Sequence, residues 1–121
     1  MRILKYRTFF QWAKSENLNN SALKSAVEEI EKGLFDASLG GNLYKKRIAK
    51  KGRGKSSGYR AILAFKADTR TIFLYGFAKN ERDNISSNEE VAYKKLAGYF
   101  LEITDLQIEV LIKNGELFEV I

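Results

Sequence analysis

Residues 43–82 read LYKKRIAKKGRGKSSGYRAILAFKADTRTIFLYGFAKNER. This stretch has twelve basic and two acidic residues, a net charge of +10, whereas the rest of the chain has nine basic and thirteen acidic residues, a net charge of −4. It also has the strongest β-strand pattern of the sequence, interrupted by a loop rich in Gly, Ser and Lys. A cationic sheet of this kind suits a polyanion such as nucleic acid, although a solvated basic surface would have the same pattern.

The length and composition predict one globular domain, residues 1–121, because the chain has 121 residues and 45% of them are hydrophobic. Apolar runs stay below the roughly 18 residues that span a membrane, and the N-terminus lacks the apolar segment of a signal peptide. We therefore expect a cytoplasmic protein with no membrane contact. The absence of Cys and His excludes disulfides, thiolate chemistry, the commonest general base and the commonest zinc ligand.

The first forty residues predict a short strand and two helices. Residues 2–6 form the strand, and Thr8 with Gln11 has the spacing of a capping box that starts the first helix. The second helix follows a break at residues 17–20, and Gly33 is expected to adopt the left-handed conformation at its end. Its apolar positions recur at helical spacing: Leu23, Ala26, Val27, Ile30 and Leu34.

The remaining residues predict a meander followed by two helices. Gly40 and Gly41 turn the chain into three strands, at residues 43–49, 59–66 and 71–77, and their short connections indicate antiparallel neighbours. A capping box of Ser86 with Glu89 starts the third helix, Thr104 or Asp105 caps the last one, and residues 117–121 form a final strand. The expected apolar stripes of these helices are Ala92, Leu96, Phe100 and Ile103, then Leu106, Val110 and Leu111. This order predicts an α+β fold with the helices on one sheet face.

The loop at residues 50–58 invites comparison with a phosphate-binding P-loop, because it contains Gly54-Lys55-Ser56. The comparison fails, since Ala49 stands where the first glycine of that motif is needed and the loop joins two strands. Glycines and cations can still approach a phosphate closely. The loop therefore contributes candidate RNA contacts: Lys50, Lys51, Arg53 and Lys55.

Alternation within the first meander strand places Lys45 and Arg47 on one face and Lys46 on the other. Two cations at this spacing repel each other unless they share an anion such as a phosphate. Arg60 starts the next strand and is expected to join them, facing solvent or substrate. Residues after the third strand are expected to complete the surface: Lys79, Asn80 and Arg82.

Aromatic residues alternate with the cations, and most of them should belong to the core. Tyr59 adjoins both Arg60 and the loop, so it is the candidate for stacking on an RNA base. Carboxylates are sparse in this stretch, which argues against a two-metal nuclease, and no metal or cofactor is expected.

Three segments together resemble a known family: Tyr44-Lys45-x-Arg47, Ser56-Ser57-Gly58-Tyr59-Arg60 and Gly76-Phe77-Ala78-Lys79-Asn80-Glu81-Arg82. They are similar to the RelE superfamily of toxins from type II toxin–antitoxin systems, in particular its RelE/HigB branch. The resemblance covers the order of elements in almost the whole chain. It implies a RelE-like ribonuclease fold and a metal-independent mRNA endonuclease that acts on the translating ribosome. It also implies a cognate antitoxin, for which a helix-turn-helix protein is one candidate.

The resemblance assigns site residues unevenly. RelE toxins have two basic residues on the first meander strand, which match Lys45 and Arg47, and an Arg after a Gly-Tyr pair, which matches Arg60. They also have an Arg after the third strand and a Tyr on the C-terminal element, where this chain has Asn80 and Ser86. Lys79, Arg82 or Lys55 could compensate. A Lys crowded by cations can act as a base, and Arg can clamp a phosphate. The predicted catalytic residues are Lys45, Arg47, Arg60 and Lys79.

Two other functions remain compatible with this fold. A ParE-like toxin that poisons gyrase would share it, but that branch generally lacks the cation cluster. A non-catalytic module that binds RNA or the ribosome is kept open by Asn80 and Ser86, which stand where the family has catalytic side chains.

Overall fold

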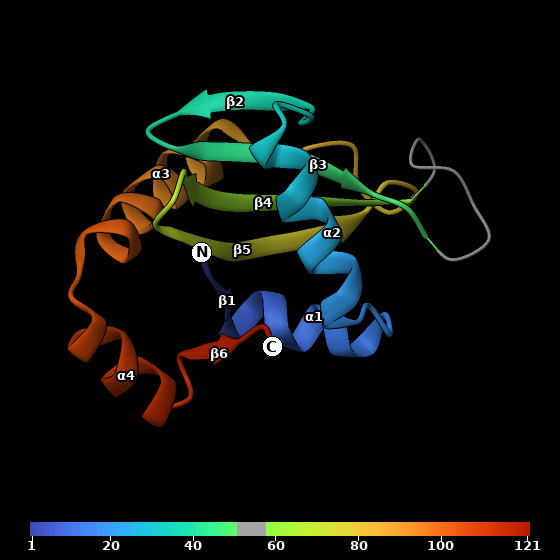
Figure 1. Ribbon diagram of the computed structural model, residues 1–121. Helices are drawn as coiled ribbons and strands as arrows, with labels where there is room; N and C mark the ends of the chain where they lie inside the picture. Colours follow the sequence, from blue (N-terminus) through green and yellow to red (C-terminus); the bar gives the residue numbers. More distant parts are fainter. Residues whose placement is uncertain (51–57) are drawn as a thin grey trace.

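The computed structural model describes residues 1–50 and 58–121. The described residues form six strands and four helices (Figure 1): β1 (Arg2–Tyr6), α1 (Arg7–Ser15), α2 (Asn20–Glu31), β2 (Ala37–Gly40), β3 (Leu43–Ile48), β4 (Tyr59–Lys66), β5 (Arg70–Ala78), α3 (Ser87–Glu102), α4 (Asp105–Lys113) and β6 (Leu117–Glu119). All the predicted strands and helices are therefore confirmed, and the predicted bounds of the strands shift by two residues or fewer. β2 was not predicted.

All six strands of the described chain belong to one sheet, in the order β2-β3-β4-β5-β1-β6. β3, β4 and β5 are antiparallel neighbours, so the predicted meander is confirmed. β1 pairs in parallel with β5, and β6 returns beside β1 in the antiparallel direction (Figure 1). The chain is thus an α+β fold built on a mostly antiparallel sheet.

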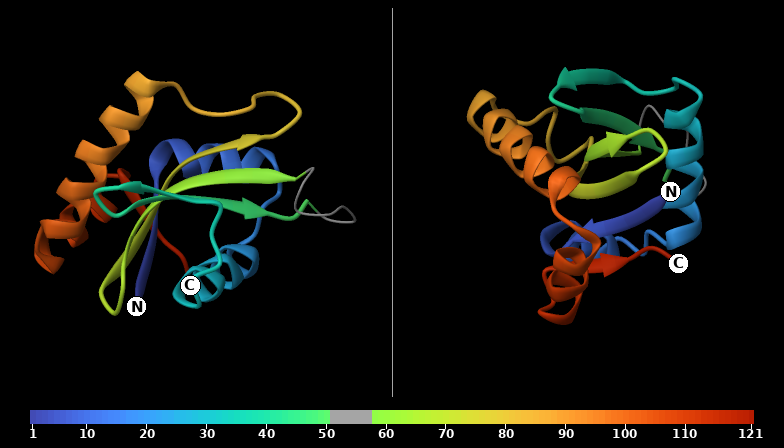
Figure 2. Two further views of the ribbon diagram at one scale, coloured as in Figure 1. Left: turned by 90° about the horizontal axis from the view of Figure 1, so that it is seen from above. Right: turned by 60° about the vertical axis from the view of Figure 1, so that its left-hand side comes forward.

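The helices cover both faces of the sheet, so the expectation that they share one face is wrong. α1 and α2 pack on one face through Phe9 and Leu23, whereas α3 packs on the other through Phe100. The right-hand view of Figure 2 shows α2 in cyan and α3 in orange on opposite sides of the strands. β4 explains the arrangement, because its residues from Tyr59 to Phe65 are all buried. An apolar run without alternation needs cover on both faces.

The first helix begins differently from the prediction. Its N-cap is Tyr6, and Thr8 lies inside the first turn, so the predicted capping box of Thr8 and Gln11 is wrong. The Thr8 hydroxyl instead donates a hydrogen bond of 3.0 Å to the carbonyl of Leu74. Because α1 follows β1 without a connecting loop, the helix starts before the predicted cap.

The second helix follows the prediction closely. Asn19 caps it by accepting a hydrogen bond from the Ala22 N–H, and the predicted stripe from Leu23 to Ile30 is buried. Gly33 follows the last turn with a φ of 83°, as predicted. Leu34 lies beyond the helix and is 56% exposed, so it does not belong to the stripe.

α3 begins at the predicted capping box of Ser86 with Glu89. α4 begins at Thr104, one of its two predicted caps, and Thr104 forms a capping box with Gln107 that was not predicted. Their predicted stripes are partly wrong: Phe100 is buried, but the other buried positions are Ala97 in α3 and Ile108 in α4. Ala92 is exposed, as are Leu106 and Val110. The reason is visible in Figure 1, where α4 extends away from the sheet, so only a narrow side of it is covered. No helix in the described ranges is long and apolar enough to cross a membrane.

Candidate active site

Strand β3 divides its cations between the two faces of the sheet. Lys46 is buried on the α2 face, where its Nζ lies 2.5 Å from Glu29 Oε1. Tyr44 and Ile48 pack on the same face. Lys45 and Arg47 therefore lie on the opposite face, as the alternation predicted.

Arg60 lies directly opposite Arg47 in the pairing of β4 with β3, and so it shares the face of Lys45 and Arg47. Its side chain is only 5% exposed, which corrects the expectation that it faces solvent. β4 is the central strand of the meander and is covered on both sides, so even its first residues are buried. A buried guanidinium needs nearby acceptors.

Asp36 supplies acceptors to both arginines. Its Oδ2 lies 3.0 Å from Arg47 Nε and 3.4 Å from Arg60 Nε. Its Oδ1 accepts a hydrogen bond of 3.3 Å from the backbone N–H of Arg47. The Asp36 side chain is 14% exposed, so these contacts form in a largely dry environment. One carboxylate therefore bridges two like-charged neighbours.

The β2–β3 hairpin places Asp36 at this position. Ala37 is the register partner of Lys45, and the Asp36 N–H donates a hydrogen bond of 2.9 Å to the Lys45 carbonyl. The sequence prediction missed Asp36 because it missed β2, whose four residues, ASLG, are too few to give a clear strand pattern. The available signal was the Gly40-Gly41 turn, since a tight turn before one strand calls for a partner strand on its other side.

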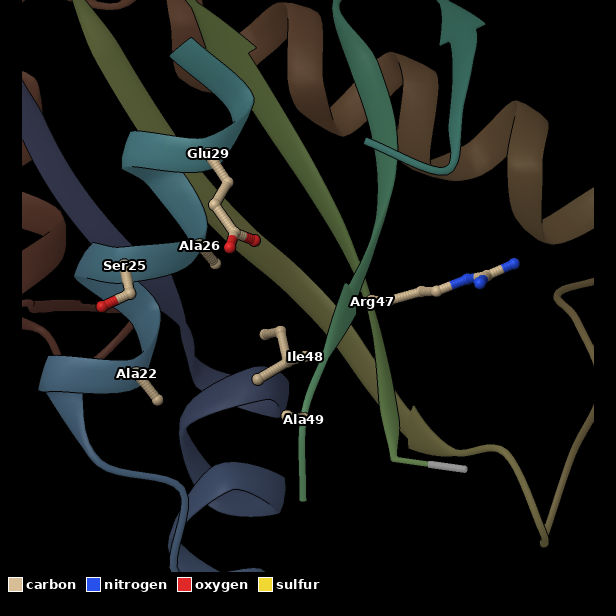
Figure 3. A pocket seen from close by; sticks show the side chains of 7 residues that line it. All are labelled: Ala22, Ser25, Ala26, Glu29, Arg47, Ile48 and Ala49. Atoms are coloured by element: carbon tan, nitrogen blue, oxygen red, sulfur yellow. The ribbon is translucent and has the colours of Figure 1, made fainter. Parts of the chain in front are cut away.

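Arg47 extends away from α2 and into open space. Figure 3 shows the cavity between α2 and β3, lined by Ala22 and Glu29 on the helix, and shows the Arg47 side chain leaving it on the far side of the strand. This cavity has a volume of about 150 Å³ and belongs to the α2 face. The Arg47 side chain is 51% exposed, so its outer nitrogens can reach a ligand.

Arg82 is held by a network at the start of α3. Its Nη1 donates hydrogen bonds to Tyr75 Oη (3.0 Å) and Glu89 Oε2 (2.9 Å), and its Nε donates to the Asn84 carbonyl (2.8 Å). Its Nη2 forms an ion pair with Glu89. Hydrogen bonds from Arg82 and the Ser86 backbone lower the pKa of Glu89 to about 2. Arg82 therefore ties its loop to α3, and all three guanidinium nitrogens are engaged.

The same loop reaches the sheet face that carries Lys45, Arg47 and Arg60, here called the cation face. Its Asn84 Oδ1 accepts a hydrogen bond of 3.5 Å from Lys45 Nζ. Lys79 and Asn80 are exposed just beyond β5. Phe77 is the register partner of Arg60. Lys79 comes two residues after Phe77 and therefore lies near the β4 end at which Arg60 is placed. Asn84 was not identified from the sequence, because nothing local indicates that it approaches Lys45.

Tyr59 and Lys50 do not join this face. Tyr59 is 4% exposed on the α1 and α2 side, where its ring meets Trp12 edge to face, so the expectation that it stacks on a base is wrong. As the residue before Arg60 in a strand, it must point to the opposite side. Lys50 Nζ lies 5.9 Å from the centre of the Tyr59 ring. The other predicted loop contacts lie outside the described residues: Lys51, Arg53 and Lys55.

Ser86 is engaged in capping α3, where its hydroxyl accepts a hydrogen bond of 3.2 Å from the Glu89 N–H. It therefore has a structural partner where the family resemblance places a catalytic side chain. Within residues 1–50 and 58–121, no group of three or more His, Cys, Asp and Glu side chains is placed to hold a metal ion.

The cation face thus combines Lys45, Arg47 and Arg60 with a single bridging carboxylate, Asp36. Arginine forks suit bidentate contacts with phosphate oxygens, and a lysine beside them can move a proton or add charge. The arrangement is suited to gripping one backbone phosphate of a polyanion.

Comparison with known protein families supports this interpretation. Residues 1–120 match the family described as the RelE toxin of the RelE/RelB toxin–antitoxin system. A search of curated proteins found no match to the chain.

Proposed function

The chain belongs to the RelE toxin family and is a toxin of a toxin–antitoxin system; from this we propose that it is an endoribonuclease that cuts mRNA on the ribosome, in the cytoplasm, and so inhibits translation. The observation that supports the proposal is the meeting of Lys45, Arg47 and Arg60 on one face of the sheet. A phosphate-cleaving site needs positive charge that is fixed before the substrate arrives.

In the proposed reaction, the 2′-oxygen of a ribose attacks the adjacent phosphorus, and the bond from phosphorus to the 5′-oxygen of the next nucleotide breaks. The products are a 2′,3′-cyclic phosphate and a 5′-hydroxyl. Arg47, the exposed arginine of the pair, holds the phosphate oxygens, whose negative charge rises in the transition state, and the nearly buried Arg60 adds positive charge beside it. One group must accept the 2′-hydroxyl proton and another must protonate the leaving oxygen, and Lys45 and Lys79 are the side chains proposed for these transfers.

Further polar and basic side chains are proposed to hold the RNA on either side of the cleaved phosphate. Asn80 is exposed just beyond β5 and available for this role, whereas Lys50 is exposed but lies beside Tyr59, away from the cation face. Lys51, Arg53 and Lys55 stay candidates from the sequence alone. Arg82 adds positive charge to the surface, but its guanidinium already donates hydrogen bonds to Glu89, Tyr75 and Asn84. We therefore propose that it attracts RNA by its charge without contacting the cleaved phosphate.

The family implies a cognate antitoxin. We propose that the antitoxin covers the cation face with acidic side chains, since complementary charge favours fast and selective association. A helix-turn-helix protein stays one candidate for this partner.

A non-catalytic RNA-binding or ribosome-binding module is the second candidate function. The capping role of Ser86 favours it, because that hydroxyl is already engaged. Poisoning of gyrase has no comparable support.

The test is to induce the protein in growing bacteria and to map the 5′ ends of cellular mRNA, with Arg47→Ala as the inactive control. Cuts in phase with codons are the expected result. A DNA-damage response without cuts would point to gyrase. Growth arrest with neither result would leave ribosome or RNA binding as the function.

A further inference from the structure

We propose that Asp36 is a positioning residue of the active site: it holds the Arg47 and Arg60 side chains by their Nε atoms, so that Arg47 presents its outer nitrogens to the RNA phosphate. This inference rests on the proposed ribonuclease function. It assigns to Asp36 an effect on cleavage that acts through the two arginines.

The contacts of Asp36 fit a residue that positions the two arginine side chains, and they do not fit a general base that takes a proton from the substrate. Oδ1 is bonded to the backbone N–H of Arg47, and Oδ2 lies between Arg47 Nε and Arg60 Nε. Both oxygens are therefore occupied by donors that keep their protons, since an arginine is charged at any physiological pH. With 14% of its side chain exposed, Asp36 has little surface left for substrate.

The contact with Asp36 leaves the Nη atoms of Arg47 available for a ligand. Asp36 contacts the Nε, which lies at the base of the guanidinium fork. Within residues 1–50 and 58–121, the Nη atoms of Arg47 have no hydrogen-bond or ion-pair partner, and the side chain is 51% exposed. A long arginine side chain with one anchored nitrogen loses less freedom when its outer nitrogens bind a phosphate.

Arg47 and Arg60 would repel each other without Asp36. They are register partners on adjacent strands, a placement in which like charges destabilise the pair. Arg60 is also buried, and a buried charge needs a counter-charge or acceptors. Asp36 lies close to both guanidinium groups and so sets their mutual geometry as well as their charge balance.

This role makes a prediction that simple electrostatics would not. Asp36 is negative, so it weakens the attraction of the surface for RNA. Asp36→Asn should therefore bind RNA at least as tightly as the wild type while cleaving it more slowly. A misaligned arginine commonly costs on the order of 10–100-fold in rate. Binding and cleavage moving in opposite directions distinguish positioning from unfolding, which would weaken both.

The experiment compares wild type, Asp36→Asn, Glu29→Gln and Glu28→Gln in single-turnover mRNA cleavage on ribosomes, in RNA binding over a salt series and in thermal unfolding. Glu29→Gln is the matched control, because Glu29 also pairs with a β3 cation, Lys46, but on the other face. Glu28→Gln repeats the charge change at an exposed site of α2. Only Asp36→Asn should slow cleavage by folded protein.

A mutant cycle tests whether Asp36 acts through Arg47. In an Arg47→Ala background, the loss caused by Asp36→Asn should shrink by at least about threefold relative to the loss in wild type, since coupled residues are not additive. Equal losses in both backgrounds would overturn the proposal. Cleavage by Asp36→Asn at the wild-type rate would also overturn it.

If Asp36→Asn does not fold, Asp36→Glu takes its place, because it keeps the charge but displaces the oxygens by one methylene. Reduced cleavage with unchanged RNA binding supports positioning, and wild-type cleavage contradicts it. Failure of the proposed function is recognised separately, because the wild-type protein itself would then cut no mRNA.

Discussion

Arg47 and Arg60 face each other across neighbouring strands, and a carboxylate that precedes an unpredicted strand lies between them. The pair therefore has one exposed member, Arg47, and one buried member, Arg60. This difference separates their contributions to stability from their contributions to the proposed chemistry.

Arg47→Ala should abolish most cleavage and leave the fold intact. We expect a loss of roughly 10²–10³-fold, as for other side chains that stabilise transition-state charge. Half of the side chain is exposed, so its removal should change the free energy of unfolding by no more than about 0.5 kcal/mol. Cleavage assays and thermal unfolding of purified protein measure both effects. Arg47→Lys should restore only part of the activity, because an ammonium lacks the fork.

Arg60→Ala should reduce cleavage by a similar factor and also destabilise the protein. The side chain is 5% exposed and lies beside Asp36, so its removal leaves a cavity and a poorly compensated carboxylate. A cost of about 1–3 kcal/mol is expected, visible as a lower melting temperature and a lower urea midpoint. An unchanged melting temperature would show that Arg60 is not buried in solution.

Lys46→Ala should have the opposite effect to Arg47→Ala: it should destabilise the protein without slowing cleavage. Lys46 is buried against Glu29 on the α2 face, away from the cation face, so the change should cost about 1–3 kcal/mol of stability. Cleavage per folded molecule should stay close to that of the wild type. If Lys46→Ala stops cleavage and Arg47→Ala does not, the assignment of the active face is wrong.

Glu89 should contribute an acid-sensitive part of the stability. Its pKa falls from 4.5 to about 2 in the folded protein, chiefly because of the hydrogen bond from Arg82. A lowered folded pKa means that this contribution is complete above about pH 4.5 and is lost as the pH falls towards 2. Glu89→Gln should therefore lower the melting temperature near neutral pH, and the difference from wild type should vanish towards pH ~2. Glu102→Gln, an exposed change on the same helix, should show no such trend.

Gly76→Ala should be strongly destabilising, because a Cβ at this position of β5 would overlap the ring of Trp12. Overpacking of this kind typically costs about 1–3 kcal/mol. Gly98→Ala is the matched control, since a Cβ at Gly98 in α3 would meet no described atom within 4 Å. That change should stabilise the protein by about 0.5–1 kcal/mol, which chemical denaturation can measure. Equal effects of the two changes would contradict the close packing of α1 on β5.

Elements with strong local patterns could be predicted from the chain alone. The strand bounds of β4, the caps of α3 and α4 and the left-handed Gly33 all depend on residues close in sequence, so their physical causes are local. The face of β3 that carries Lys45 and Arg47 follows from the two-residue period of a strand. The position of Arg60 beside them follows from the meander.

Other features depend on contacts between distant residues, which only the folded sheet decides. The burial of Arg60 comes from the central place of β4, and the loss of Tyr59 from the RNA surface comes from α1 packing on that side. Asn84 approaches Lys45 because Arg82 anchors its loop to α3. Asp36 reaches the arginines because the register of β2 against β3 places it there. Strand pairing and helix packing bring together residues that are far apart in the sequence and that no local pattern connects. These long-range contacts decide the geometry of the site.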